Sequence, residues 1–396
     1  MPAFPCTWPE ERATVASING PPAVTETDYS YHPDEAKKGV PLLTTQSKSW
    51  AKLADAKSYR AGPTTVYYNR VNPSEVRFEP ADGKNDRLAF ARWLVSPQQP
   101  LTARVAVNRH WQLLFGRGFV DTPEDFGAQG ALPSHPELPD WLAAEFIASG
   151  RDVKALLRRM VLSATYRQSS VITAEHRGKD PENRWLARAP RVRLAGNVLR
   201  DQALLVSGLL TEKPGGPSVF PYQPAGLWEE ASNARYTVGK GRDLYRRSLY
   251  TYWKRTLAPP SMALLDTGDR EYCSVKPKYT NTPLQALTLL NETTFVESAR
   301  KLAERMLTEG EATDADRITF GFGVVTNRAP TARELQVLAT ALADYRREFA
   351  ANPKGASATL EVGNSPAAKD LPPVEVAAAT ALANVLLNLD EVTTRE

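Results

Sequence analysis

Cysteine and histidine are scarce in this chain of 396 residues, and their scarcity excludes several kinds of site. The two cysteines, Cys6 and Cys273, are distant in sequence and lie outside any C-x-x-C pattern. A disulfide framework, a cysteine zinc site and a C-x-x-C-H haem attachment are therefore excluded. The four histidines include no pair spaced three or four residues apart. We expect neither a metal site nor a cofactor within the chain.

Long apolar segments and a strong charge of one sign are lacking as well. No apolar run approaches the roughly 18–20 residues that cross a bilayer, so the sequence predicts no membrane span. The first residues, Met1 to Pro5, lack the basic and apolar segments of a secretory signal. The chain is accordingly either cytoplasmic or a piece of a longer exported protein. A net charge of +4, from 49 basic and 45 acidic residues, argues against nucleic acid as a partner.

Helix-start signals are the most frequent local feature of the sequence. An N-cap residue that precedes proline, or that pairs with a glutamate or glutamine three residues on, satisfies the free amides of a first helical turn. Few segments show the alternation of a half-buried strand. We therefore predict a mainly α fold, an irregular multi-helix bundle with a loop-rich N-terminal arm and minor short strands. Helix starts are expected at Thr122-Pro123, Ser134 with Glu137, Asp152, Asp180-Pro181, Thr282-Pro283 and Thr331 with Glu334.

Composition divides the chain into four parts. Residues 1–75, rich in Pro, Thr, Ser and Lys, are expected to form an irregular N-terminal arm. Residues 76–351 form the principal helical domain, and residues 352–372 have the composition of a flexible linker. Residues 373–396 are expected to form a C-terminal helix that docks on the principal domain.

The phrase Pro-Leu-x-Ala-x-x-x-x-Asn occurs twice, over residues 100–108 and 283–291. Proline at the first helical position explains much of it as efficient helix initiation. The final asparagine has no part in capping, so Asn108 and Asn291 are expected to lie near each other on helices that face one core. This arrangement predicts two related halves with a polar pocket between them.

Polar and aromatic residues cluster on the first of these helices. Arg104 and Asn108 are four residues apart and share one face. Arg109 adjoins them, and Trp111 follows one turn on. As a binding site, the guanidinium would hold an anion and the indole a sugar or porphyrin face. In the structural interpretation, Asn108 would form hydrogen bonds with the backbone of a neighbouring loop, and Arg104 would form an ion pair with a carboxylate such as Asp125. The sequence leaves both interpretations open.

Three acidic residues in the second half of the chain are candidates for a catalytic role. Asp266, Asp269 and Glu271 supply the hard oxygen ligands of a divalent cation, or a carboxylate pair for work on a glycoside. The spacing matches no EF-hand, and Arg270 beside them offers a simpler salt bridge.

His135 is a second candidate for acid–base chemistry. It sits at an expected helix start, where the helix dipole disfavours the protonated ring, and this suits a general base. An acidic partner such as Asp125 would be needed. The structural alternative is a capping and packing role, and Ser134 before it is explained by capping alone.

Residues 245–255 interleave aromatic and basic side chains. Such mixtures form nucleic-acid or saccharide platforms through stacking and cation–π contacts, with Arg247 as the candidate ligand contact. Tyr245, Leu249 and Trp253, however, have the spacing of the buried stripe of a helix, which favours core packing. Asn281, Gln285 and Asn291, around the second copy of the repeated phrase, complete the set of candidate binding residues.

An ordered series of motifs runs from about residue 86 to the C-terminus. It includes Val107-Asn108-Arg109, Asp125-Phe126-Gly127, Ser134-His135-Pro136-Glu137-Leu138, Tyr245-Arg246-Arg247-Ser248-Leu249-Tyr250, Thr280-Asn281-Thr282-Pro283-Leu284-Gln285 and Leu387-Asn388-Leu389-Asp390-Glu391. On these motifs the chain resembles the C-terminal domain of unknown function in large exported proteins of planctomycete-type bacteria. Such proteins often carry a cytochrome-c-like domain upstream.

The resemblance implies a periplasmic or cell-envelope location and a cytochrome-c-like domain as partner. It also implies that haem c is held only in that upstream domain, which is missing from this chain. Residues 1–75 do not look like the region that usually precedes the family's domain, so we interpret them as truncated or non-native.

The favoured hypothesis is a binding or scaffolding module that acts beside a haem domain, with a glycan as a possible ligand. The alternative is a hydrolase acting on saccharides or esters. It would use the group of Asp266, Asp269 and Glu271, or His135 with Asp125. Hydrolysis requires two carboxylates about 5–10 Å apart in an open cleft, whereas scaffolding predicts carboxylates bonded to arginines.

Overall fold

A computed structural model describes residues 86–96, 99–127, 129–228, 235–254, 257–268, 274–276 and 278–395. The expected N-terminal arm, residues 1–75, lies outside the described residues. The chain divides into two compact units between Arg191 and Val192, so the single principal domain expected over 76–351 is wrong. We describe each unit by itself.

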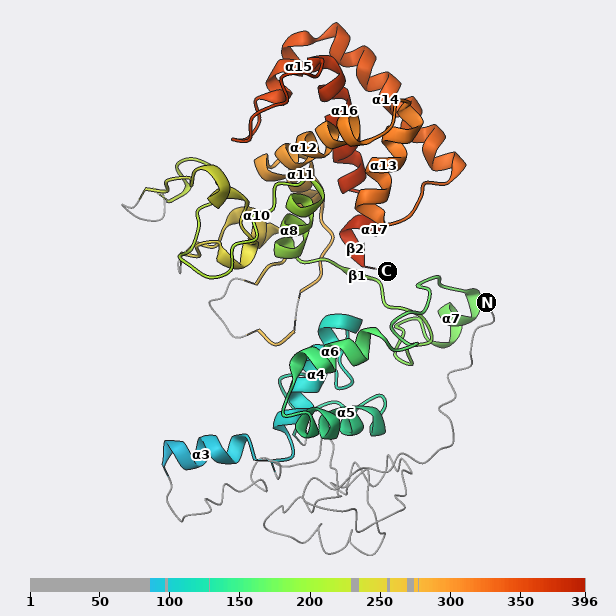
Figure 1. The fold of residues 1–396 in the computed structure, drawn as a ribbon. Helices are drawn as coiled ribbons and strands as arrows, with labels where there is room; N and C mark the ends of the chain where they lie inside the picture. The colour runs from blue at the N-terminus through green and yellow to red at the C-terminus, as the bar shows by residue number, and fades with distance from the viewer. Residues whose placement is uncertain are drawn as a thin grey trace, which may run out of the picture. The chain divides into compact units, whose positions relative to one another are not determined.

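Unit 1 is built on one long helix that two others cover (Figure 1). The central helix is α4, whose buried face carries Val107, Trp111 and Phe115. It ends at Gly116, whose φ of 74° is the left-handed conformation that favours glycine. Its helices within the described residues are α3 (Arg87–Leu94), α4 (Thr102–Phe115), α5 (Glu137–Ala148), α6 (Val153–Val161) and α7 (Ala174–Lys179).

Unit 2 contains the remaining helices and one small sheet (Figure 1). Strand β1 (Val192–Arg193) pairs antiparallel with β2 (Thr394–Arg395), which joins the two ends of the unit. Across the described residues there are fourteen α-helices and this one two-stranded sheet, so the mainly α prediction is confirmed. The helices are α8 (Gly196–Val206), α10 (Pro260–Leu264), α11 (Pro283–Asn291), α12 (Thr293–Glu309), α13 (Asp314–Thr326), α14 (Ala332–Ala351), α15 (Pro353–Leu360), α16 (Pro373–Leu387) and α17 (Asp390–Thr393).

Helices α12 and α16 pack against each other at the centre of unit 2. Helix α16 is rich in alanine, and Ala377, Ala378 and Ala383 are fully buried, so its backbone lies close to its neighbours. The C-terminal helix is therefore a central core element and not a peripheral docking helix.

The linker expected over 352–372 is also wrong, because its first half is helix α15. The side chain of Asn352 accepts a hydrogen bond from the amide of Gly355 (3.0 Å), and Pro353 follows at the first helical position. The Asn-Pro pair is thus a helix start, although its small and polar neighbours have the composition of a linker.

Three of the six expected helix starts are confirmed, and three are not. Asp152, Thr282 and Thr331 cap helices α6, α11 and α14. The other three segments form turns or uncapped starts: Thr122-Pro123, Ser134 with Glu137, and Asp180-Pro181. A side chain that accepts hydrogen bonds from nearby backbone amides stabilises an isolated turn as well as a helix. The cap-residue pattern therefore does not distinguish a turn from a helix start.

Residues 245–254 do not form the helix that the spacing of Tyr245, Leu249 and Trp253 suggested. The chain here contains two short 3-10 turns, η2 (Gly241–Tyr245) and η3 (Ser248–Tyr250), and Leu249 is exposed. Buried Arg200 donates hydrogen bonds to the carbonyls of Leu244 (2.7 Å) and Arg246 (2.9 Å). These carbonyls accept hydrogen bonds from a side chain that is distant in sequence. This long-range contact takes the place of the local backbone hydrogen bonds that an α-helix would make.

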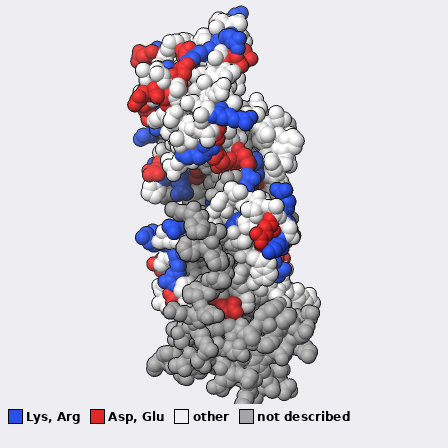
Figure 2. Space-filling view, turned by 90° about the vertical axis from the view of Figure 1, so that its right-hand side faces the viewer, with Lys and Arg blue, Asp and Glu red and all other residues white. Residues whose placement is uncertain are grey.

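Among the described residues, none of the helices combines the length and apolar character needed to cross a membrane. On the face drawn in Figure 2, acidic and basic side chains are interspersed. The part of that face that Figure 2 does not draw in grey therefore presents no broad surface of a single charge.

Candidate functional site

Arg104, on the inner face of α4, forms hydrogen bonds that hold unit 1 together. Its Nε donates to the carboxylate of Asp140 on α5 (2.8 Å), and its Nη1 donates to the carbonyl of Pro100. Arg104 and Asp140 are 8% and 3% exposed. The expected ion pair exists, but its partner is Asp140 and not Asp125.

Asn108 is the polar link between α4 and the loop that follows it. Its side-chain amide donates to the carbonyl of Val120 (3.2 Å) and accepts from the amide of the same residue (3.0 Å). Gly118 lies so close that a Cβ there would sit 2.7 Å from the Asn108 amide group. Asn108 thus binds a neighbouring backbone, as its structural interpretation predicted, while Arg109 beside it is exposed.

The second copy of the repeated phrase has a different environment. Asn291 is exposed and donates to the carbonyl of Leu287 one turn back (2.8 Å), so the expectation that both asparagines face one core is wrong. The first copy belongs to unit 1 and the second to unit 2. Asn281 is exposed as well.

Asp266 is held by hydrogen bonds from the start of α11. Its Oδ2 accepts from the amide (2.6 Å) and hydroxyl (2.7 Å) of Thr280 and from the buried amide of Gln285 (3.1 Å). Burial opposes ionisation, but these bonds outweigh it and hold the pKa of Asp266 below its usual range. Asp266 is therefore an ionised structural acceptor. Asp269 and Glu271 lie outside the described residues.

His135 contacts aromatic rings and not an acidic partner. Its ring meets Phe119 and Trp185 edge-on, and its Nδ1 lies 3.0 Å from the Ser134 hydroxyl. Burial lowers the pKa of His135, and the positive charge of Arg184 lowers it further. The Asp125 carboxylate instead accepts from the amide of Gly127 (2.7 Å) in its own turn.

The basic residues of the 245–255 stretch have separate roles. Arg247 is exposed, with its Nε 3.6 Å from the Asp201 carboxylate. Arg246 is buried and donates to the carbonyls of Lys213 (2.8 Å) and Pro217 (3.0 Å), and it stacks on Tyr250. Arg246 thus fastens a loop. The core packing predicted from the aromatic spacing holds for Tyr245, which is buried, and is wrong for Leu249, which is exposed.

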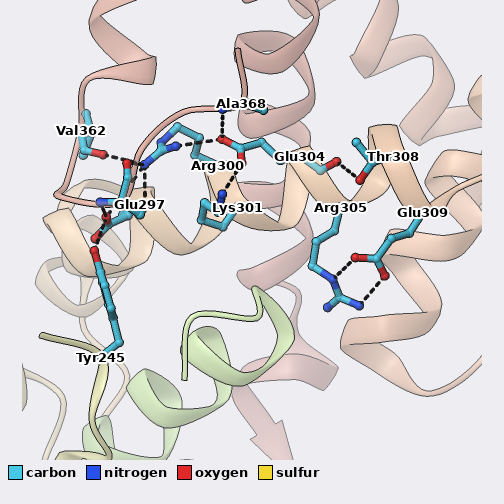
Figure 3. Close-up of polar contacts among 11 residues, drawn as sticks. Tyr245, Glu297, Arg300, Lys301, Glu304, Arg305, Thr308, Glu309, Val362 and Ala368 are labelled. Carbon is cyan, nitrogen blue, oxygen red and sulfur yellow. Dashed lines mark hydrogen bonds and ion pairs between the residues drawn. The ribbon is translucent and has the colours of Figure 1, made fainter. Parts of the chain in front are cut away.

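The densest set of buried charges in the described chain lies on α12 (Figure 3). Arg300 donates to Glu304 (2.8 Å) and to the carbonyl of Ser365 (2.7 Å). Glu297 accepts from the hydroxyl of Tyr245 (2.8 Å) and from the amide of Ser365 (2.6 Å). Burial raises the pKa of Tyr245 to about 12, so the phenol remains a donor. We call these five residues the α12 cluster. It fastens the loop between α15 and α16.

Gly363 in that loop gives a first prediction. Its φ is +87°, and a Cβ at this position would clash with the carboxyl group of Glu297. Replacing Gly363 with alanine should lower the free energy of unfolding by at least about 1–2 kcal/mol, because strain and the clash add. Urea unfolding followed by circular dichroism measures this. Gly178→Ala is the control, since a Cβ there meets nothing within 4 Å; equal effects would contradict the assignment.

Unit 1 contains an open groove with a volume of about 650 Å³. It lies beside α5 and α6, and we call it the α5–α6 groove. Its apolar lining consists of Trp111, Leu138, Trp141, Leu142, Met160 and Leu162. Arg158, Arg159, Ser163 and Thr165 supply its polar atoms.

The two arginines of the groove differ in their partners. Arg159 forms an ion pair with Glu145, and its guanidinium lies 5.0 Å from the centre of the Trp141 ring. Arg158 is exposed and has no ion pair within the part of the chain that the structure describes. The groove therefore combines an apolar floor with one guanidinium not already neutralised.

Sequence reasoning found only Trp111 among the groove residues. Helix α6 has an available signal, because Leu156 and Met160 are buried while the arginines between and beside them face outward. Nothing in that pattern distinguishes a groove wall from an ordinary solvated face. Within the described residues, no three His, Cys, Asp or Glu side chains gather as metal ligands would.

Comparison with curated proteins and with solved structures gave no match. A protein family described as PSD1, protein of unknown function (DUF1553), matches residues 86–342. The match begins at the first described helix and continues into α14, so it includes the groove, both copies of the repeated phrase and every residue of the α12 cluster except Ser365. Because it covers well over half of the sequence, the chain belongs to the PSD1 (DUF1553) family of proteins of unknown function.

Proposed function

We propose that this chain is a binding module and that its ligand occupies the α5–α6 groove. The single observation that supports this is the groove itself. Its volume of about 650 Å³ falls within the roughly 300–1,000 Å³ of small-molecule sites, which are mostly apolar with a few placed polar groups. Trp141 and Arg158 supply an aromatic face and a charge at the groove.

The hydrolase alternative has less support in the described residues. Asp266 accepts hydrogen bonds from Thr280 and Gln285 at the start of α11, and Asp125 accepts one within its own turn. The half-buried ring of His135 meets two aromatic rings edge-on. A glycosidase needs an acid and a base that face a common opening. None of these three side chains lines the α5–α6 groove.

The cellular setting is part of the same proposal. We expect the module to belong to an exported protein of the cell envelope and to act beside a cytochrome-c-like domain that carries haem c. The family resemblance of the sequence motifs supports this setting.

Turnover and binding assays on the full chain test the proposal. We expect no hydrolysis of p-nitrophenyl esters or glycosides above the buffer rate, and the same result for Asp266→Asn and His135→Asn. A panel of glycans and amphipathic acids should contain a compound that raises the melting temperature and changes tryptophan fluorescence. Turnover that either substitution abolishes would overturn the proposal in favour of a hydrolase.

A further inference from the structure

We infer that the α5–α6 groove selects an amphipathic anion, with a flat apolar body against the groove wall and an acidic head at Arg158. The inference rests on the proposed function and gives its ligand a chemical class.

The floor of the groove favours an apolar body. Trp111, Leu142 and Met160 are each no more than 4% exposed, so the floor is a packed hydrophobic surface. The Ser163 hydroxyl is already bonded, because it donates to the carbonyl of Met160 (2.7 Å) and accepts from the amide of Tyr166 (3.1 Å). Sugar hydroxyls placed here would lose water and find few partners, which costs free energy for each unpaired group. A neutral glycan is thus disfavoured.

The rim of the groove favours a negative charge. Glu145, the acidic partner near the rim, is neutralised by Arg159. The Arg159 guanidinium also lies over Trp141, which fixes the indole beside the opening. Arg158 has no such partner among the described residues and is exposed, so its donors are available to a carboxylate, sulfonate or phosphate.

The geometry also gives the orientation of the ligand. Arg158 and Met160 are both on α6, with the first exposed and the second buried. A ligand must therefore place its acidic group outward and its apolar group inward. A planar ring system fits best, because the Trp141 indole lines the groove and a flat apolar ring can pack against it.

A matched pair of fluorescent probes tests this directly on the full chain. 1-Anilinonaphthalene-8-sulfonate is an apolar ring system with an anionic group, and N-phenyl-1-naphthylamine is the same ring system without it. We expect both probes to bind with energy transfer from tryptophan, and the sulfonate to bind more tightly. Arg158→Gln should weaken the sulfonate by about two- to five-fold and leave the neutral probe unchanged, since an exposed charge contact is modest. The control substitution Arg177→Gln, on α7, should change the affinity for neither probe.

Ala155→Trp tests the location. Ala155 lines the groove, so an indole there should fill it and remove most of the binding of both probes. Ala174→Trp, at the exposed start of α7, is the matched control and should leave binding intact. Circular dichroism and melting temperature verify that both variants fold.

The outcomes separate this inference from the proposed function. If Ala155→Trp folds and leaves binding unchanged, or if Arg158→Gln weakens both probes equally, the inference is overturned. If a neutral glycan binds in the groove and competes with the probes, the ligand class is wrong while the proposed function stands. Substrate turnover, by contrast, overturns the proposed function itself.

Discussion

Replacing Arg300 with methionine should lower the free energy of unfolding by about 3–5 kcal/mol. The Arg300 side chain is fully buried and bonds Glu304 and the carbonyl of Ser365. Methionine fills a similar volume but removes the cation beside the fully buried Glu297, 3.9 Å away, while Glu304 keeps its ion pair with Lys301. An uncompensated buried charge is costly because the low-dielectric interior replaces little of its lost hydration. Urea unfolding followed by far-ultraviolet circular dichroism measures the loss.

Arg347→Met is the matched control for this experiment. Arg347 pairs with Asp344 on α14, but its side chain is 79% exposed. Water solvates both partners after the substitution, so the change should stay within about 0.5 kcal/mol. If the Arg300 variant is as stable as the Arg347 variant, the α12 cluster does not hold the loop between α15 and α16.

Replacing Asn108 with alanine should cost about 2–4 kcal/mol of stability in unit 1. The substitution leaves the amide and the carbonyl of Val120 without their partner, and each unsatisfied buried group costs roughly 1–3 kcal/mol. Urea unfolding followed by tryptophan fluorescence measures the loss, because Trp111 is one turn away. Unit 2 also contains tryptophans, Trp228 and Trp253, so the curves are fitted with one transition for each compact unit.

Asn291→Ala provides the comparison, because it removes the equivalent residue of the second copy. Its side chain is exposed and bonds only within its own helix, so the expected change is below about 0.5 kcal/mol. Similar losses in the two variants would mean that the repeated phrase has one structural role in both places. A large loss of stability in the Asn108 variant alone means that the two copies have in common only their position at the start of a helix.

Local patterns predicted the elements whose stabilising groups lie within a few residues. Thr331 and Glu334 form a reciprocal capping box at the start of α14, and Asp152 caps α6 through the amide of Ala155. These bonds span three residues, so the sequence contains both partners in one window. The same reasoning failed at Asp180, whose carboxylate accepts the amides of Arg184 and Trp185 in an isolated turn.

The candidate site was less predictable, because its side chains acquire their roles from distant partners. Trp111 was found from α4 alone, but Trp141 and Arg158 belong to helices whose local patterns resemble ordinary amphipathic surfaces. Arg104 was expected to pair with a carboxylate, and the choice of Asp140 depends on how α5 packs on α4.

The sequence by itself determined the mainly α class, several helix starts and the resemblance to a family of unknown function. These follow from residues that interact within one or two turns. The tertiary structure alone decided which of two identical motif residues is buried: Asn108 bonds Val120 in a loop, while Asn291 faces solvent. It also decided that Arg158 lies beside the apolar floor of the α5–α6 groove with no ion-pair partner among the described residues. Burial and pairing across the fold depend on neighbours that are distant in sequence, and no local spacing encodes them.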